Sequence, residues 1–387
     1  MKIGFVISSI NSKSNGLGGH YHSLLETADQ LSKKHDVFII NVGNNPAKAL
    51  KGTKFKLFLI IDKGYAIFRT YKKIISILKN EKPDMLHAFD SSAYYWVRLA
   101  GNKLQIPFCI TKCGGVNPVY FPYAKNLVLF STENLNFFKS KRKFKDSNLS
   151  LIPNRIKDFE DDNSQIEKIH YRLGIYANTF KFLRITRIGN YYHNSSLQLI
   201  CLVNKLSNDG IKCCAIFIGT VEDEHYLKEL KKQGNSNCFF FTEPEFTKNA
   251  KHLINSADAV LGTGRSFMEA AAKEKILLSP VQNSFIPALI KRENFKTAFY
   301  YNFSERITIK NFDESLNYNQ IKNVIQNKEK QKEQTAFAAE IFTEYFDAKK
   351  IGDKYEKVYA NAQKAKTPKK RIDWLLHTLF LIRNYYR

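Results

Sequence analysis

The stretch ADAVLGTGRSFMEA, residues 257–270, contains the parts of a strand, a loop and a helix in that order. The apolar run at 259–261 is typical of a buried strand, and residues 266–273 have the pattern of a helix. Gly262 and Gly264 lie between them, so the connecting backbone can approach a ligand and offer it N–H groups at the start of the helix. The stretch therefore predicts a β–α unit whose loop can hold an anion such as phosphate.

Three polar side chains of this stretch suit a nucleotide. Arg265 offers a charged fork for phosphate, and Ser266 is a natural N-cap. Glu269 lies one turn inside the helix, where its carboxylate can accept hydrogen bonds from hydroxyls such as those of a ribose. The same spacing also fits a capping box between Ser266 and Glu269, so both interpretations of Glu269 stay open.

Strand and helix patterns alternate outward from this unit in both directions. We expect strands at 2–10, 37–42, 55–61, 85–88, 108–112, 127–130, 182–185, 215–218, 239–241, 260–261 and 276–278. We expect helices at 19–33, 65–80, 92–104, 132–140, 195–207, 222–232, 248–255 and 266–273. Such alternation predicts an α/β protein with parallel sheets that carry helices on both faces.

One interruption divides the alternation. It falls at Leu151-Ile152-Pro153-Asn154-Arg155 and the polar stretch 157–165. We therefore expect two Rossmann-like domains, 1–155 and 156–312, and a helical segment 313–387 that can cross back to the first domain. Ligands of such sheets bind at the carboxyl ends of the strands, so the site is expected in a cleft between the two domains.

Two further loops follow expected strands. Gly18 and Gly19, within Gly16-Leu17-Gly18-Gly19-His20, precede the first helix, where they form either a ligand-binding loop or a plain tight turn. The other loop lies in 184–194. Its Arg187 is the best candidate to pair with a diphosphate, with His193 or Asn194 assisting; a solvated surface arginine is the alternative.

Charge and composition limit the functional classes. The chain has 60 Lys and Arg against 36 Asp and Glu, a net charge of +24, which favours a polyanionic partner: nucleic acid, anionic lipid or a phosphorylated small molecule. No helix-turn-helix, RRM or zinc module is recognisable, so nucleic acid is disfavoured. The six cysteines form no CxxC pair, and no carboxylate cluster suits magnesium. We expect neither metal nor cofactor, and a cytosolic protein.

Several segments together resemble the GT-B glycosyltransferases of the large retaining family usually called family 4. They are the Gly-Gly-His loop, the segments 82–88 (KPDMLHA), 110–115 (ITKCGG) and 151–155 (LIPNR), and 257–260 with 264–270. The resemblance covers essentially the whole chain. It implies the GT-B fold and transfer of a sugar, with retention, from a nucleotide diphosphate donor. UDP is the expected nucleotide. The acceptor would be a glycan or a lipid-linked molecule in bacterial surface polysaccharide synthesis, such as capsule or lipopolysaccharide.

The resemblance also implies roles for single residues. Arg187 matches the arginine that neutralises the donor diphosphate, and Glu269 matches the carboxylate that holds the ribose. Gly18 and Gly19 match the loop that closes over the phosphates and sugar. Glu243, at the end of the segment 241–243, would lie near the base.

The chain departs from the family pattern in ways that keep alternatives open. The first of the usual two glutamates is Leu261, and the lysine that usually follows the arginine is absent, with His193 and Asn194 in its neighbourhood. The chain therefore looks like a divergent branch. A catalytically inactive GT-B module that binds nucleotide or glycan, and a GT-B nucleotide-sugar epimerase, are the alternatives.

Three polar residues of the first domain are candidates near the sugar. His87 and Asp90 lie at an expected strand end, although His87 can equally be a buried structural residue. Lys112 is a candidate phosphate or acceptor contact. No metal ion is required for this chemistry, because arginine and backbone N–H groups can meet the charge that develops on the leaving diphosphate.

The C-terminal segment 366–387 combines basic and apolar residues. We expect a basic amphipathic helix that either lies on an anionic membrane, with Trp374 at the headgroup level, or packs across the domains. The run 139–145 (KSKRKFK) is a second basic patch. If both patches face one side, they point to a lipid-linked acceptor and a peripheral membrane location.

Overall fold

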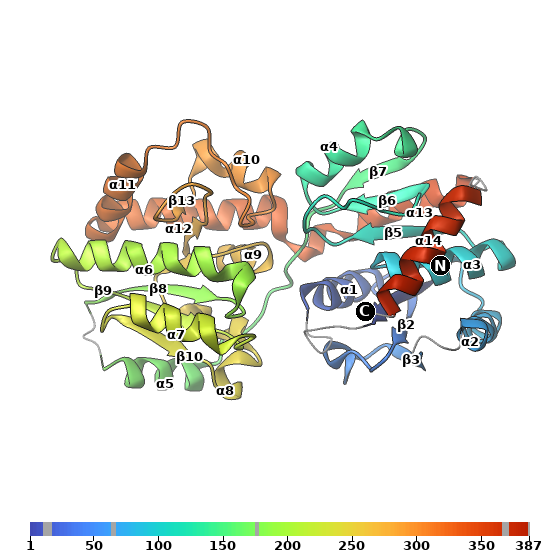
Figure 1. The fold of residues 1–387 in the computed structure, drawn as a ribbon, viewed down its shortest axis with the longest axis horizontal. Coiled ribbons are helices and arrows are strands. Elements are labelled where there is room, and N and C mark those ends of the chain that lie inside the picture. Colours follow the sequence, from blue (N-terminus) through green and yellow to red (C-terminus); the bar gives the residue numbers. More distant parts are fainter. Residues whose placement is uncertain (11–17, 63–66, 175–177, 366–370, 386–387) are drawn as a thin grey trace. The chain divides into compact units, whose positions relative to one another are not determined.

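The computed structural model describes residues 1–10, 18–62, 67–174, 178–365 and 371–385 (Figure 1). The chain forms two compact units. Unit 1 comprises Met1–Arg155 and Ala348–Arg387, and unit 2 comprises Ile156–Asp347. The segment 313–387, expected as one helical extension, is thus divided between the units at residue 347.

Unit 1 is built on a seven-stranded sheet in which every neighbouring pair is parallel. The strand order is β3-β2-β1-β4-β5-β6-β7, so the order reverses between β1 and β4, the point where α/β sheets bind ligands. The strands are β1 (Lys2–Ser9), β2 (Asp36–Gly43), β3 (Lys56–Ile61), β4 (Met85–Ala88), β5 (Phe108–Lys112), β6 (Asn126–Leu129) and β7 (Asn148–Leu151).

Helices cover both faces of this sheet because successive residues of each strand point to opposite sides. In β1, Phe5 packs in a core with α1 and α13, whereas Val6 packs in a second core with α2 and α3. The helices of unit 1 are α1 (Gly19–Leu31), α2 (Ile67–Glu81), α3 (Ser91–Leu104), α4 (Thr132–Ser140), α13 (Gly352–Lys364) and α14 (Arg371–Tyr385), with the short helices η1 (Lys48–Leu50), η2 (Arg142–Phe144) and η6 (Ala348–Lys350).

Unit 2 repeats this plan with six strands in the order β10-β9-β8-β11-β12-β13. All pairs are parallel except β12 with β13, which is antiparallel. The order reverses between β8 and β11. The strands are β8 (Phe180–Ile185), β9 (Cys213–Ile218), β10 (Cys238–Phe241), β11 (Ala259–Leu261), β12 (Ile276–Ser279) and β13 (Ala288–Leu289).

The helices of unit 2 lie on both faces of its sheet (Figure 1). One core contains Phe267 stacked on Phe303, with ring centroids 3.7 Å apart. The helices are α5 (Asn163–Leu173), α6 (His193–Asn208), α7 (Glu224–Gln233), α8 (Pro244–Thr247), α9 (Arg265–Ala272), α10 (Arg292–Tyr300), α11 (Glu314–Gln326) and α12 (Lys328–Ile341), with η3 (Asn190–Tyr192), η4 (Ala250–Ser256) and η5 (Phe342–Phe346).

The expected α/β architecture of two doubly wound parallel sheets is confirmed. Several elements differ from the sequence expectation, and α8 and α10 were not expected at all. β7 continues the first sheet where the alternation was expected to stop, α5 occupies part of the expected polar stretch, and β13 adds an antiparallel edge. Among the described residues, no helix is both long enough and apolar enough to cross a bilayer.

Candidate functional site

Two loops meet at the strand reversal of unit 2. One joins β8 to α6 and the other joins β11 to α9, and β8 pairs directly with β11. Both loops therefore begin at neighbouring carboxyl ends of the sheet, where parallel strands leave room for a ligand. Both loops were predicted from the sequence to bind phosphate, and the fold brings them to the same edge of the unit 2 sheet.

Each glycine of the β11–α9 loop also has a structural reason of its own. A Cβ on Gly262 would lie 2.4 Å from the Cα of Phe267, closer than real contacts allow. Gly264 has φ +50° and ψ −114°, a conformation that favours glycine, and is the N-cap of α9. Gly262 thus lets the loop pass close to its own helix, and Gly264 supplies the backbone conformation at which the helix begins, whatever either does for a ligand.

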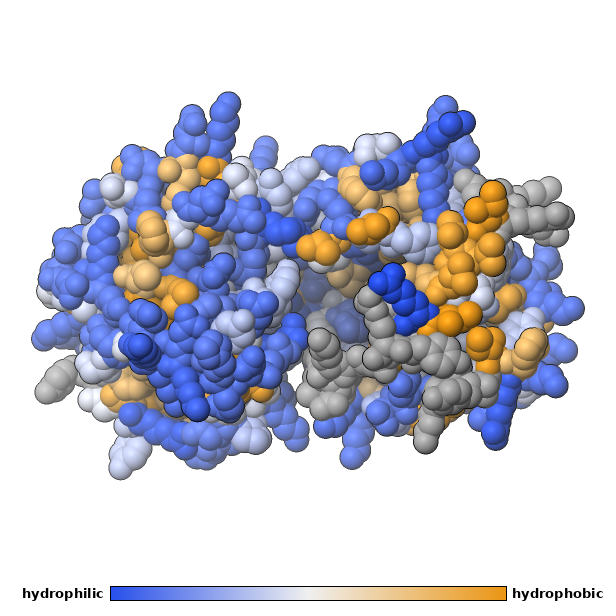
Figure 2. Space-filling view, in the orientation of Figure 1, coloured by the Kyte–Doolittle hydropathy of each residue, from blue (hydrophilic) through white to orange (hydrophobic). Residues whose placement is uncertain are grey.

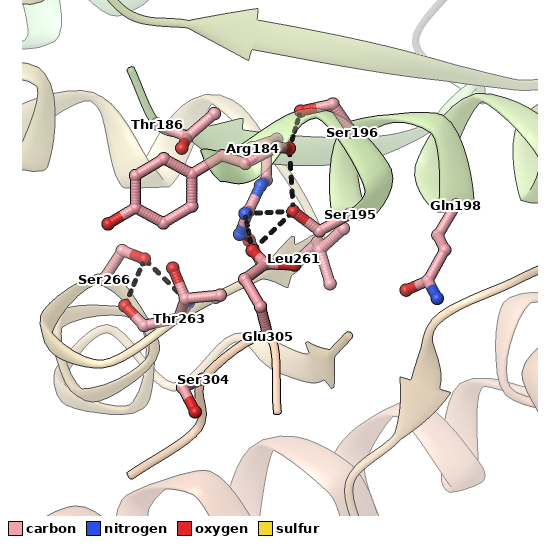
Figure 3. A network of polar contacts seen from close by, with 12 residues as sticks. Arg184, Thr186, Ser195, Ser196, Gln198, Leu261, Thr263, Ser266, Ser304 and Glu305 are labelled. Carbon is pink, nitrogen blue, oxygen red and sulfur yellow. Dashed lines mark hydrogen bonds and ion pairs between the residues drawn. The ribbon is translucent and has the colours of Figure 1, made fainter. Parts of the chain in front are cut away.

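The expected N-cap at Ser266 is wrong, because α9 begins one residue earlier, at Arg265. The Ser266 hydroxyl accepts a hydrogen bond from the backbone N–H of Thr263 and donates one to its carbonyl, both at 3.0 Å (Figure 3). Glu269 is ion-paired to Arg265, with Nε 2.7 Å from Oε1. The capping-box alternative for Glu269 therefore fails, and Arg265 instead fixes this mostly buried carboxylate in the first turns of the helix.

A buried ion pair that the sequence did not indicate holds the same edge together (Figure 3). Arg184, near the end of β8, is fully buried, and donates from Nη1 to the carbonyl of Leu261 at 3.0 Å. Its Nη2 lies 3.0 Å from the carboxylate of Glu305 and 2.6 Å from Ser195 Oγ. The Ser195 hydroxyl in turn lies 2.7 Å from the same carboxylate.

Burial controls the electrostatics of this pair. Loss of solvent raises the pKa of Glu305, and the nearby Arg184 guanidinium opposes that rise. Burial likewise lowers the pKa of Arg184, against the effect of Glu305. The pair joins the end of β8, the first turn of α6 and the loop around residue 305 into one framework beneath the two loops.

Arg187 follows β8 on the surface side of this framework. Its Nη1 lies 2.5 Å from Glu222 Oε1, and its guanidinium lies over the ring of Tyr192 at 5.5 Å. The side chain remains 44% exposed, so a ligand can reach it. A diphosphate would compete with Glu222 for the guanidinium.

His193 and Asn194 open α6 but differ in environment. His193 is buried, with Nε2 3.2 Å from Glu229 Oε2, whereas Asn194 is exposed. Glu243 follows β10, two strands away from β8 on the same edge, and binds Arg172 through Oε1 at 2.6 Å. Burial would raise the pKa of Glu243, but hydrogen bonds from backbone N–H groups and from Arg172 outweigh it and lower the pKa.

The candidates of unit 1 are engaged in structural contacts. His87 is fully buried, with Nδ1 2.8 Å from the Tyr359 hydroxyl and Nε2 2.7 Å from the Thr111 hydroxyl, and burial lowers its pKa to about 3. This favours the structural interpretation of His87. Asp90 caps α3 by accepting from Ala93 N–H at 2.7 Å.

Asp90 follows β4, Lys112 is the last residue of β5, and Gly18 and Gly19 lie at the start of α1. Asp90 also accepts hydrogen bonds from the backbone and hydroxyl of Ser8, both at 2.7 Å, which ties the ends of β1 and β4 together. Lys112 bonds the carbonyl of Gly114 and lies 3.0 Å from Asn134 Oδ1. Gly18 is the N-cap of α1, and the space beside Gly19 is open. The start of this loop, residues 11–17, lies outside the described residues.

Solved structures of similar shape are known, although no protein-family model and no curated protein sequence matches the chain. A glycosyltransferase from Rickettsia africae aligns with a TM-score of 0.71 at 15% identity, over 94% of this chain and 99% of its own. HepE from Anabaena, in complex with UDP and glucose, aligns with a TM-score of 0.67 at 16% identity, over 93% of this chain and 100% of its own. The chain has the GT-B fold.

An epimerase is also among the proteins with this fold. The UDP-GlcNAc 2-epimerase of Neisseria meningitidis, bound to UDP-GlcNAc, aligns with a TM-score of 0.50 at 12% identity, over 94% of this chain and 100% of its own.

Within the described part of the chain, no group of three His, Cys, Asp or Glu side chains is arranged to hold a metal ion.

Proposed function

We propose that the protein is a glycosyltransferase that moves a sugar from a UDP-sugar to a glycan or lipid-linked acceptor. The observation that carries this proposal is the pair of loops at the strand reversal of unit 2. One supplies Arg187, and the other supplies Gly262, Gly264 and the start of α9. Support also comes from neighbours of the same fold that hold UDP, glucose or UDP-glucose.

In the proposed mechanism, unit 2 binds the donor and stabilises the leaving group. Arg187 leaves Glu222 and pairs with the diphosphate, while the first N–H groups of α9 face the phosphate oxygens. Glu269, held by Arg265, accepts hydrogen bonds from the ribose hydroxyls. As the bond from the sugar to the diphosphate breaks, negative charge grows on the diphosphate, and these donors are already in place to meet it. Such a site needs no metal ion.

We extend the proposal to a retaining, divergent member of family 4 that acts in the cytoplasm in the synthesis of a bacterial surface polysaccharide. The motifs around Arg187 and Glu269 support the family assignment, and Leu261 in place of the first glutamate marks the divergence. The anomeric configuration of the product, measured by NMR, tests retention: an inverted product overturns that part alone.

The experiment measures UDP release from a panel of UDP-sugars, with and without lipid and oligosaccharide acceptors. We expect release that depends on an acceptor, and a loss of about 100-fold in kcat/KM for Arg187→Ala, because donors aimed at developing charge are commonly worth ~3 kcal/mol. Arg292→Ala is the matched control, because Arg292 is another exposed, ion-paired arginine of unit 2. Unchanged turnover in Arg187→Ala contradicts the proposed site. Binding of UDP without turnover identifies an inactive module, and conversion of UDP-GlcNAc without UDP release identifies an epimerase.

A further inference from the structure

Helix α14 is fixed to unit 1 by a buried polar anchor. The carboxylate of Asp373 lies 2.9 Å from Arg98 Nη1 and accepts hydrogen bonds from the backbone N–H of Tyr123 at 3.0 and 3.1 Å. His377, one turn later, lies 2.8 Å from the carbonyl of Ser91 through Nε2. These contacts determine which side of α14 faces the unit.

The opposite side of α14 is apolar and exposed. Figure 2 shows a row of apolar side chains along this helix. Five residues contribute, each 37–78% exposed: Ile372, Leu375, Leu376, Leu379 and Ile382. Their spacing of three and four residues places them in one stripe. An apolar stripe of this kind on the exposed side of a helix is typical of a surface that another molecule covers.

Trp374, expected from the sequence either at the headgroup level of a membrane or packed against the protein, is partly buried against unit 1. The indole packs on Arg98, with the guanidinium 4.4 Å from the ring centroid. Lys366, Lys369 and Lys370, which were expected to supply much of the positive charge, lie outside the described residues. Of the basic residues of this segment, Arg383 lies exposed in α14 itself, and further cations come from a neighbouring element.

That element is the basic turn at 139–145, which directly contacts α14. Lys143 forms an ion pair with Asp373 and lies 4.6 Å from the ring centroid of Tyr120. The Tyr120 ring in turn lies 5.4 Å from that of Phe380 in α14. Lys141 and Lys143 also line a pocket of about 140 Å³ together with Val119 of the neighbouring loop.

The basic turn at 139–145 and the loop that contains Val116 and Val119 add exposed cations and exposed apolar side chains beside the stripe. The loop adds Val116 and Val119, which are 57% and fully exposed. The turn adds four exposed cations: Lys139, Lys141, Arg142 and Lys145. We call the stripe, these two valines and these four cations the α14 surface. All of it belongs to unit 1.

We propose that the α14 surface docks the protein onto an anionic lipid bilayer. Apolar side chains beside lysine and arginine suit the bilayer interface, where the former enter the acyl region and the latter meet anionic headgroups. A second copy of this chain fits poorly, because each copy carries a net charge of +24 and would add its own cations to the contact. The proposal does not depend on the transferase activity.

The test is co-sedimentation of the full chain with vesicles of phosphatidylcholine alone or with phosphatidylglycerol added. We expect binding to the anionic vesicles that weakens as salt is raised. Leu375→Ser with Leu379→Ser should weaken binding about 100-fold, because two leucines are no longer buried. The matched control is Tyr171→Ser with Phe285→Ser, which removes two exposed apolar side chains from unit 2.

A second pair of variants tests the cations. Lys141→Gln with Arg142→Gln should weaken binding about 30-fold, since each cation near an anionic surface contributes ~1 kcal/mol. Lys231→Gln with Lys232→Gln, in α7 of unit 2, removes the same charge and should have little effect. The proposal is overturned if test and control variants weaken vesicle binding equally, or if the native protein does not bind anionic vesicles. A native dimer that Leu375→Ser with Leu379→Ser makes monomeric, without vesicle binding, would instead assign the surface to self-association.

Discussion

Replacement of Arg184 by methionine tests the buried framework beneath the unit 2 loops. Methionine reaches only as far as the Nε position of arginine, so it leaves the carboxylate of Glu305 buried without its cation and removes the donor to the Leu261 carbonyl. Breaking a buried pair in this way commonly costs ~3–5 kcal/mol. At pH 8 we expect the free energy of unfolding to fall by about 3 kcal/mol.

The loss should depend on pH, with a sign that follows from Glu305. Burial holds the folded pKa of Glu305 above its unfolded value, and Arg184 limits that rise. Stability from this group is therefore present below the unfolded pKa and is lost as the pH rises through the folded pKa. Without Arg184 the folded pKa rises further, so the deficit of the variant grows with pH. Protonation of Glu305 removes the uncompensated charge as the pH falls, so we expect a smaller deficit at pH 5, approaching the ~1–2 kcal/mol of the lost hydrogen bonds.

Urea unfolding at pH 5 and pH 8, followed by far-UV circular dichroism, measures both values. Tryptophan emission supplies a second signal that comes from unit 1 alone, because Trp96 and Trp374 both lie there. Arg292→Met, at an exposed ion pair, should leave stability nearly unchanged. An Arg184→Met variant that loses no stability, or that loses the same amount at both pH values, would contradict a stabilising buried pair between Arg184 and Glu305.

Two further predictions concern a tightly packed glycine, Gly262, and a buried histidine, His87. Gly262→Ala places a methyl group against Phe267 and should lower the free energy of unfolding by ~1–3 kcal/mol in urea titrations; an unchanged midpoint would contradict the close approach. His87, with a folded pKa of about 3, should remove about 2 kcal/mol of stability as the pH falls from 7.5 to 5, because the unfolded state takes up the proton more readily. His87→Gln should be less stable at pH 7.5, because it loses the contacts to Thr111 and Tyr359. Its free energy of unfolding, followed by tryptophan emission, should nevertheless change less with pH than that of the native protein. An equally steep change would show that His87 is not the source of the pH dependence.

The alternation of strands and helices could be predicted because local pattern and fold agree in most elements. The helix Thr132–Ser140 has the bounds that its sequence indicated, and Ser131 caps it by accepting a hydrogen bond from Asn134 N–H at 3.1 Å. β7 was missed because Asn148–Leu151 offers only two apolar residues. It forms at the edge because β6 is there to pair with it. No local pattern carries that information.

The candidate site was predictable only in part, for a related reason. Gly262, Gly264 and Arg187 directly follow strands, so their place at the carboxyl edge follows from the order of the elements. Arg184 instead sits inside an apolar strand, and its partner Glu305 is 121 residues away in the sequence. A buried charge requires a partner, but the identity of that partner depends on the tertiary fold.

The central claim is that the loops around Arg187 and Gly262–Ser266 hold a nucleotide diphosphate. The most direct measurement is a crystal structure of the protein soaked with UDP. We predict the diphosphate at these two loops, with its oxygens within hydrogen-bond distance of the Arg187 guanidinium and of the first N–H groups of α9. Diphosphate bound to a different surface, or loops that stay empty at saturating UDP, would contradict the claim.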